Sequence, residues 1–522
     1  MVWLLISLIF LSIFLRIYCS PLDVLIVSTP FVGHSFRVLS IGEELARKGH
    51  NVTFMSLDNW VNMRNKAIER GMSYLSAGRH DAEEGEWREF VLKRIELSAQ
   101  SPFTLLADFK LLTESRKLLS FDAIVEFLIR QDLKQWDVIV TEKELLQSVP
   151  CIAKSQGIPV VTVTSYYSYN TESPPWPFPS YQSGHSENLT FKGRFLSFLV
   201  TVGHRFLHAV SLKRIISGSS TTERLCSDNF KYPIESGWEV PLLVSTVLGL
   251  EYPRVLSPMT HYVGPLLSRH LLNASLEFNS HLWKWLETKS NKSVIYISMG
   301  SLVSISTDLA HAFIDGIKDT NYSVVWSLSD LNKNVIPNVV KLHPEKYHIS
   351  SWIPQLALLQ HSSIFLAILH GGANGVHEAL YHGVPGILIP FVNDQFDWSV
   401  RVEDAGVGIQ LLPHQVTSSS IKESIQRIES TDEYHKKASL LSVLMRRAGG
   451  TNEAVELIEF YATYGYDHLI PAPIKYKWNW MAYYNIDVYA IISCFVLTSM
   501  WIFKKCCCKC CCWSMNKKLK QS

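Results

Sequence analysis

Short apolar segments alternate with helical patterns along most of this 522-residue chain. Such alternation is typical of an α/β fold, because two parallel strands can be joined only through a crossover element such as a helix. The predicted strands form two groups, at residues 23–28, 51–56, 136–141 and 158–164, and at residues 294–298, 323–327, 364–369 and 386–390. The pattern therefore predicts an α/β protein with two halves, each built on a doubly wound, mostly parallel sheet.

The charge distribution separates the ends of the chain from its body. The chain carries 49 basic and 47 acidic residues, but residues 504–522 hold six lysines and no acid. Without these lysines and Arg16, the remainder carries 42 basic and 47 acidic residues. This slight acidic excess excludes nucleic-acid binding as the main function. No glycine-rich dinucleotide fingerprint follows a predicted strand, which argues against an oxidoreductase, and there is no Walker sequence.

Two apolar runs near the ends predict a targeting segment and a membrane segment. Residues 2–15 have the length and position of a signal-peptide core, so we predict a signal peptide at residues 1–20, with a retained N-terminal anchor as the alternative. Residues 488–503 are apolar, with aromatic residues before them and the lysines of the tail after them. This arrangement favours a transmembrane helix over a buried helix and predicts a cytosolic tail at residues 504–522.

The predicted orientation is that of a single-pass type I membrane protein with a lumenal body. Only Cys151 and Cys226 of the ten cysteines fall in this body, so its stability depends on a core rather than on a disulfide framework. The cysteines of the tail favour palmitoylation over a zinc site. Lys518 and Lys520 resemble a dilysine retrieval signal, which predicts the endoplasmic reticulum membrane; a plain basic tail is the alternative. Glycosylation sequons predict a glycoprotein and begin at Asn51, Asn188, Asn273, Asn291 and Asn321.

One segment, residues 352–395, concentrates residue types suited to a nucleotide. Its His-Gly-Gly sequence at residues 370–372 joins a predicted strand to a predicted helix, where free backbone N–H groups and the helix dipole favour a phosphate. On that helix, Asn374 and Glu378 share one face, and an acid at this distance can accept hydrogen bonds from ribose hydroxyls. Trp352 offers a flat face on which a base could stack. Together these groups indicate a site for a phosphorylated nucleoside.

This segment resembles the signature of the UDP-glycosyltransferases, and the membrane layout is similar to that of the animal UDP-glucuronosyltransferase branch. The matching residues are Trp352, Pro354, Gln355, His370, Gly371, Gly372, Glu378, Gly383, Pro385, Pro390, Asp394 and Gln395. The resemblance implies a GT-B fold, in which two Rossmann-like doubly wound domains face a cleft, plus the C-terminal transmembrane helix. It places an acceptor-binding domain at residues 21–264, a UDP-sugar-binding domain at 265–455, and return helices with a membrane-proximal segment at 456–487.

The resemblance also implies a role for each residue of the donor site. Trp352 would stack on uracil, Gln355 would contact the uridine and Glu378 would hold the ribose hydroxyls. The diphosphate would be bound at Ser301, His370, Gly371, Gly372 and Asn374, and the sugar hydroxyls by Asp394 and Gln395. The UDP-sugar is a co-substrate, and neither a cofactor nor a metal ion is implied, in agreement with the lack of a D-x-D sequence.

Glycosyl transfer needs a base for the acceptor hydroxyl, and the resemblance assigns this role to His34. This residue follows the first predicted strand in the sequence PFVGHS, which we expect to form a turn at the carboxyl end of the sheet. A carboxylate should orient the imidazole, and the family has an Asp after the strand that ends in Thr. Here Glu142 follows Thr141 and is one methylene longer, with Asp137 and Glu144 as alternative partners.

The donor sugar and the acceptor are predicted only by class. Arg254 matches a position where glucuronosyl-transferring relatives often carry Arg, and a guanidinium suits a carboxylate, so glucuronate is favoured over glucose or galactose. The apolar and aromatic sequence at residues 166–176 indicates a small lipophilic alcohol, phenol or lipid as acceptor. The predicted function is therefore an inverting UDP-hexosyltransferase. The alternative is a catalytically weak, UDP-sugar-binding partner of active relatives, in a homo- or hetero-oligomer.

Overall fold

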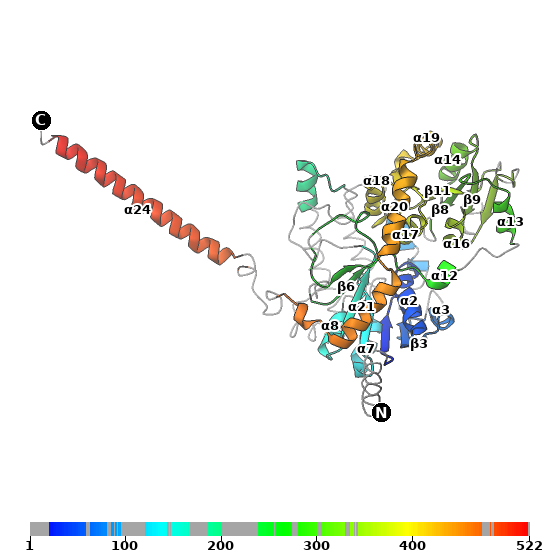
Figure 1. Ribbon diagram of the computed structural model, residues 1–522, viewed down its shortest axis with the longest axis horizontal. Helices are drawn as coiled ribbons and strands as arrows, with labels where there is room; N and C mark the ends of the chain where they lie inside the picture. Colours follow the sequence, from blue (N-terminus) through cyan, green and yellow to red (C-terminus); the bar gives the residue numbers. More distant parts are fainter. Residues whose placement is uncertain are drawn as a thin grey trace, which may run out of the picture. The chain divides into compact units, whose positions relative to one another are not determined.

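The computed structural model describes most of the chain, and Figure 1 labels several of its helices and strands. The described residues are 20–58, 63–80, 85–87, 89–90, 92–94, 121–143, 146, 148–166, 186–199, 239–254, 256–273, 280–300, 305–328, 335–338, 340, 343–471, 481 and 485–519. The chain divides into two compact units, Met1–Tyr466 and Asp467–Ser522, and both sheets lie in the first. Apart from Ser20, the predicted signal peptide lies outside the described residues.

Seven parallel strands form the first sheet, in the order β3-β2-β1-β4-β5-β6-β7. Their bounds are β1 Asp23–Val27, β2 Asn51–Ser56, β3 Ser73–Ser76, β4 Val138–Glu142, β5 Val160–Thr164, β6 Leu242–Val244 and β7 Thr260–Tyr262. The strand order reverses between β1 and β4, where Val27 pairs with Thr141. This is the order of a doubly wound sheet, with its switch point between β1 and β4.

Six parallel strands form the second sheet, in the order β10-β9-β8-β11-β12-β13. Their bounds are β8 Val294–Ser298, β9 Ser323–Ser327, β10 Tyr347–Ser350, β11 Ile364–Leu369, β12 Gly386–Leu388 and β13 Gly408–Gln410. Here the order reverses between β8 and β11, where Ser298 pairs with Leu369. The two sheets therefore share one topology, and the predicted doubly wound α/β fold is confirmed.

Helices connect the strands of both sheets (Figure 1). In the first half they are α2 Val32–Arg47, α3 Met63–Glu69, α7 Asp122–Arg130, η1 Leu133–Gln135 and α8 Val149–Ser155. From residue 269 to residue 447 they are α12 Arg269–Asn273, α13 His281–Glu287, α14 Thr307–Ile317, α16 Gln355–Leu359, α17 Ala373–Tyr381, α18 Gln395–Asp404, η3 Pro413–Gln415, α19 Ser418–Glu429 and α20 Glu433–Arg447.

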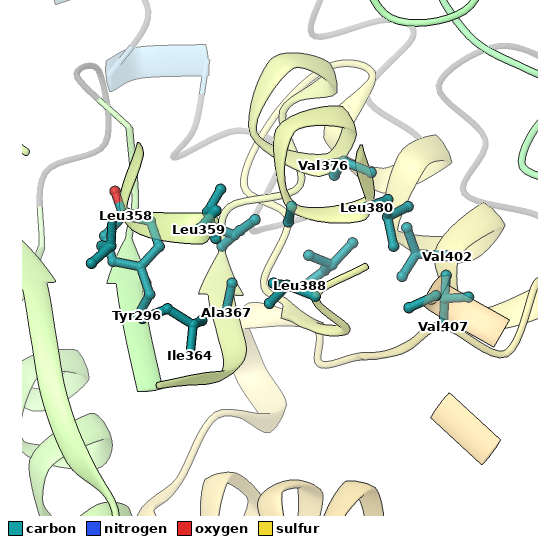
Figure 2. Packing of buried hydrophobic residues seen from close by; sticks show 14 of the residues in the cluster. Tyr296, Leu358, Leu359, Ile364, Ala367, Val376, Leu380, Leu388, Val402 and Val407 are labelled. Atoms are coloured by element: carbon teal, nitrogen blue, oxygen red, sulfur yellow. The ribbon is translucent and has the colours of Figure 1, made fainter. Parts of the chain in front are cut away.

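The core of the second half covers both faces of its sheet. Strand side chains alternate between the faces, so Val294 and Tyr296 of β8 belong to one buried cluster, and Ile295 and Ile297 belong to another. Figure 2 shows the first cluster, in which Tyr296 joins apolar residues from the strands and helices around it. A parallel sheet with two covered faces needs continuous apolar strands, and β8 (VIYIS) and β11 (IFLAIL) are fully buried.

The last helix of the first unit returns to the first half. Helix α21, Thr451–Tyr464, packs against α2. At this contact Glu459 lies 3.1 Å from Nζ of Lys48 and 2.9 Å from Nε2 of His50. The phenol of Tyr466 also accepts a hydrogen bond of 3.3 Å from the backbone N–H of Val160. These contacts tie the end of the first unit to the half that contains the first sheet.

The second unit contains η4, Asp467–Leu469, and the 34-residue helix α24, Ile486–Leu519. Within α24, the segment from Ile486 to Lys505 contains an 18-residue window with a mean hydropathy of 1.9, which makes it long and apolar enough to cross a membrane. The segment includes the predicted span at residues 488–503. The helix continues beyond this segment into the Cys-rich stretch that we predicted only as a tail.

Candidate functional site

The two switch points define where a ligand is expected. In open parallel sheets, ligands bind beyond the carboxyl ends of the strands at which the strand order reverses. In the first sheet these ends lead to the segment after β1 and to Glu142, the last residue of β4. In the second sheet they lead to the segment after β8 and to His370, which follows β11. Residues predicted to act in catalysis and in diphosphate binding therefore lie at the switch points.

His34 and Glu142 are brought together by this topology. Nδ1 of His34 lies 3.3 Å from Oε2 of Glu142, and the His34 side chain is 36% exposed whereas that of Glu142 is 1% exposed. The predicted turn around His34 is wrong, because α2 begins at Val32 and His34 lies in its first turn. Phe31 has extended dihedral angles and is the N-cap, so the connection ends before Gly33. The helix, rather than a loop, therefore fixes the position of His34.

Backbone and hydroxyl groups hold the Glu142 carboxylate in place. Oε1 accepts hydrogen bonds from the backbone N–H of Thr29 at 2.5 Å and from the hydroxyl of Ser28 at 3.3 Å. Burial alone would raise the pKa of Glu142, but hydrogen bonding to His34, its charge and the bonds from Thr29 outweigh burial and lower the pKa. Glu142 is thus ionised at neutral pH, and its longer side chain spans the distance between Thr29 and His34.

On the donor side, glycines enclose the imidazole of His370. A Cβ atom at Gly372 would lie 2.4 Å from Nε2 of His370, and one at Gly300 would lie 2.8 Å from Cε1. Gly371 has a φ of +78°, which L side chains rarely adopt. Burial lowers the pKa of His370 to about 4, although a backbone hydrogen bond at Ser298 opposes this shift. His370 is therefore a neutral hydrogen-bonding group, and the predicted Ser301 lies outside the described residues.

Gln355 and Glu378 are in direct contact. The side-chain amide of Gln355 donates a hydrogen bond to Oε2 of Glu378, and its carbonyl oxygen accepts one of 2.7 Å from the hydroxyl of Tyr296. Burial raises the pKa of Glu378 to about 7, and the bond from Gln355 lowers it only in part. Trp352, in the loop between β10 and α16, is 72% exposed. Tyr296 was not predicted, although it is the one polar side chain before Ser298 in the strand sequence VIYIS.

Helix α17 also reaches the first half of the molecule. The side-chain amide of Asn374 donates a hydrogen bond of 3.2 Å to the carbonyl oxygen of Gly33, the residue before His34. One turn further along, Nε2 of His377 lies 3.0 Å from the hydroxyl of Thr246. The helix that carries the predicted diphosphate and ribose contacts therefore touches the helix that carries His34.

The predicted sugar-binding pair lies at the start of α18. Asp394 is the N-cap of this helix, after Asn393 with a φ of +57°, and Gln395 is its first residue. The side-chain carbonyl of Gln395 accepts hydrogen bonds from the backbone N–H groups of Phe391 and Val392, at 2.8 and 3.0 Å. These bonds orient the amide of Gln395, so its NH₂ group points away from the loop backbone.

Arg254, the residue predicted to contact a sugar carboxylate, lies in a buried ion pair. Its side chain is 2% exposed, and Nη2 lies 2.8 Å from Oε1 of the buried Glu251. Nε of Arg401, in α18, lies 3.0 Å from the same oxygen. Sequence reasoning did not predict Glu251 or Arg401, because no local motif links residues 150 positions apart. Contact between Arg254 and a sugar carboxylate stays a prediction.

Comparisons with known proteins agree with this geometry. Human UDP-glucuronosyltransferase 1A1 is 24% identical, over 91% of this chain and 89% of the relative. Mouse UDP-glucuronosyltransferase 3A2 is also 24% identical, over 96% of this chain and 95% of the relative. UDP-glycosyltransferase 1 of Phaeomoniella chlamydospora is 28% identical, over 50% of this chain and 58% of that protein.

Solved structures support the fold. The calicheamicin glycosyltransferase CalG4 has a TM-score of 0.56 at 16% identity, and the glycotransferase of kitacinnamycin has a TM-score of 0.57 at 19% identity. Both alignments cover 84% of this chain and 98% of the other, and the two parallel sheets are arranged as in GT-B glycosyltransferases. The family profile described as "UDP-glucoronosyl and UDP-glucosyl transferase" matches residues 23–521. The chain therefore belongs to the UDP-glucoronosyl and UDP-glucosyl transferase family.

Proposed function

We propose that this protein is an inverting UDP-glycosyltransferase that moves a hexosyl group from a UDP-sugar to a hydroxyl of a small lipophilic acceptor. The observation that carries the proposal is the pair at the first switch point, where Oε2 of Glu142 lies 3.3 Å from Nδ1 of a partly exposed His34. A histidine oriented by an ionised, buried carboxylate is suited to act as a general base. Family membership supports a UDP-sugar as the donor.

In the proposed reaction, Nδ1 of His34 faces Glu142, so Nε2 is the nitrogen that takes the proton of the acceptor hydroxyl. The acceptor oxygen then bonds to the anomeric carbon. The bond from that carbon to the diphosphate oxygen breaks, UDP leaves with the electron pair, and the configuration at the carbon inverts. Because Glu142 is ionised, it stabilises the imidazolium that forms on His34.

The leaving UDP would be stabilised by the start of α17. The N-terminal end of this helix carries a partial positive charge and free N–H groups, and neutral His370 can donate a hydrogen bond there. Trp352, Gln355 and Glu378 would hold the uridine. We propose that neither a cofactor nor a metal ion is needed. Activity should then be the same in EDTA as in Mg²⁺, and a loss of activity in EDTA that Mg²⁺ restores would contradict this.

We favour glucuronate as the transferred sugar, because the animal relatives are named UDP-glucuronosyltransferases. The resemblance described above, which implies an Arg at the position of Arg254 in glucuronosyl-transferring relatives, supports the same choice. The buried ion pair of Arg254 with Glu251 weakens the argument from a direct contact. UDP-glucose and UDP-galactose are therefore the alternative donors. The acceptor is proposed as a lipophilic alcohol, phenol or lipid.

We propose the endoplasmic reticulum membrane as the location, with a single type I span and a lumenal body. The apolar segment of α24 supports a membrane helix. Cys151, in α8, is disulfide-bonded, and disulfides persist in oxidising compartments such as this lumen. Protease protection of the body in sealed microsomes, with a tail epitope accessible from outside, would test the orientation.

The replacement of the family's Asp by Glu142 favours a second candidate, a catalytically weak UDP-sugar-binding partner that pairs with active relatives. UDP release from microsomes, with UDP-glucuronate, UDP-glucose or UDP-galactose and a panel of lipophilic acceptors, separates the two candidates. Release that depends on one donor, on an acceptor and on His34 supports the transferase. UDP binding without any release, together with co-purification of a relative, supports the partner.

A further inference from the structure

A segment that follows the strand β6 of the first sheet, residues 247–251, lies in the buried core of the second half. After β6 ends at Val244, Val247 and Leu250 pack with Trp398 and Val402 of α18 in the same buried cluster. The segment continues through Glu251, whose side chain is fully buried. Helix α18 therefore packs against a part of the chain that comes directly from the first sheet.

Glu251 connects this segment to α18 through two arginines. Its Oε1 lies 2.8 Å from Nη2 of Arg254 and 3.0 Å from Nε of Arg401, and it accepts a hydrogen bond of 3.0 Å from the backbone N–H of Tyr252. Both arginine side chains are nearly inaccessible, at 2% and 6% exposed. Because a buried carboxylate and a buried guanidinium each lose hydration, removing one partner leaves the others uncompensated.

Further contacts hold the same helix along its length. Nη1 of Arg401 donates a hydrogen bond of 3.1 Å to the carbonyl oxygen of Asp397, and its guanidinium lies over the ring of Tyr252 at 4.9 Å. The hydroxyl of Tyr252 donates a hydrogen bond of 2.6 Å to Asp404, the last residue of α18. Arg401 is six residues from Gln395, which is about 9 Å along a helix. The position of Gln395 and Asp394 therefore depends on where Glu251 holds α18.

We propose that Glu251 is a positioning residue of the sugar subsite, which fixes α18 and with it Asp394 and Gln395, and that Arg254 acts through Glu251 rather than by contact with the sugar. This inference rests on the proposed function, because it takes Asp394 and Gln395 as the sugar contacts. Arg254 is 2% exposed and its Nη2 lies 2.8 Å from Oε1 of Glu251, so a sugar carboxylate at Arg254 would compete with Glu251 for this guanidinium. The direct contact is therefore disfavoured. Replacing Arg254 should weaken the binding of an uncharged UDP-sugar and that of a UDP-sugar with a carboxylate to the same degree.

The test compares the dissociation constants of UDP, UDP-glucose and UDP-glucuronate for the full-length protein and its variants. The readout is the ratio of the constant for each UDP-sugar to that for UDP, because UDP lacks the sugar and so cannot make the contacts proposed for Asp394 and Gln395. Glu251→Gln and Arg254→Met should each raise this ratio about tenfold, equally for both sugars. The double variant should raise it little further than either single variant. Glu44→Gln is the matched control, since Glu44 is also buried and contacts two arginines, Arg47 and Arg269, but lies on α2.

Tyr252→Phe is the milder variant if Glu251→Gln fails to fold, because it removes only the bond to Asp404, and it should change the ratio in the same direction. A loss of affinity for UDP-glucuronate alone in Arg254→Met would overturn the inference and establish a direct contact. Unchanged ratios in variants that melt at a lower temperature would also overturn it and leave a purely structural role. If the unaltered protein binds no UDP, the proposed function itself fails.

Discussion

The side-chain amide of Asn374, at the start of α17, donates a hydrogen bond of 3.2 Å to the carbonyl oxygen of Gly33, next to His34. Through this bond the proposed donor helix contacts the helix that carries the proposed base. Asn374→Ala should raise the KM for the UDP-sugar and lower kcat, each by about tenfold, because it removes a polar contact at both places. Asn374→Asp should lose more activity, since a carboxylate would face a carbonyl oxygen and the diphosphate. Steady-state kinetics check this order, and an Asp variant more active than the Ala variant would contradict it.

Glu142→Asp is expected to lower kcat, although it restores the residue that the family carries. The Glu142 carboxylate contacts Thr29 and His34 at the same time, and a side chain shorter by one methylene cannot keep both contacts. A displacement of about 1 Å costs up to about 100-fold in rate when it disturbs a catalytic contact. Rates at saturating substrate for Glu142→Asp and Glu142→Gln measure this. A rise in kcat for the Asp variant would show that Glu142 is an impaired substitute.

Trp352→Ala should weaken UDP binding without destabilising the protein. The Trp352 side chain is 72% exposed, so its removal leaves no cavity in the core. Stacking of a base on an aromatic ring contributes about 1–3 kcal/mol, which corresponds to a loss of about 5- to 150-fold in affinity. Calorimetric titration with UDP measures the affinity, and thermal melting measures the stability of the protein. Trp352→Phe is the matched control and should retain most of the affinity; equal losses in both variants would exclude stacking.

Donor binding should strengthen as the pH rises from about 6 to 8, because the pKa of Glu378 is about 7 and only the ionised form accepts bonds from both ribose hydroxyls. The sign follows from burial, which raises this pKa and keeps the carboxyl protonated below it. UDP-glucose is the ligand of choice, since its diphosphate diester does not titrate in this range. Glu378→Gln should remove the pH dependence, and an unchanged slope in that variant would assign it to another group.

The sequence predicted the parts of the fold that depend on local pattern. Continuous apolar strands such as β8 and β11 were predicted because burial on both faces of a parallel sheet requires them. Strands β10 (YHIS) and β7 (THY) were missed, because they are short and partly polar and are stabilised by their neighbours. The first turn of α2 was predicted as a loop, since Gly33 and Pro30 indicate a turn in sequence.

The candidate site, like the fold, was predicted where it depends on local sequence patterns and missed where it depends on contacts between distant residues. His370 could be identified from the strand-to-helix turn that it opens, whereas His34 and Glu142 were assigned through the resemblance to the family, at strand ends that parallel strands bring together. The contacts that fix their neighbours could not, because they join distant positions, as Tyr296 joins Gln355 and Glu251 joins Arg401. The predicted contact of Arg254 with a sugar was inferred from the resemblance and from its charge, whereas its burial appears only in the folded chain.

The central claim is that His34, held by Glu142, removes the proton of the acceptor hydroxyl. It is tested most directly by the acceptor-dependent release of UDP in His34→Ala, measured beside the dissociation constant for UDP in the same variant. The account predicts that release falls by about 10²- to 10⁴-fold, the usual contribution of a general base, while UDP binding stays unchanged. Release at the rate of the unaltered protein would contradict the account and remove His34 from the mechanism.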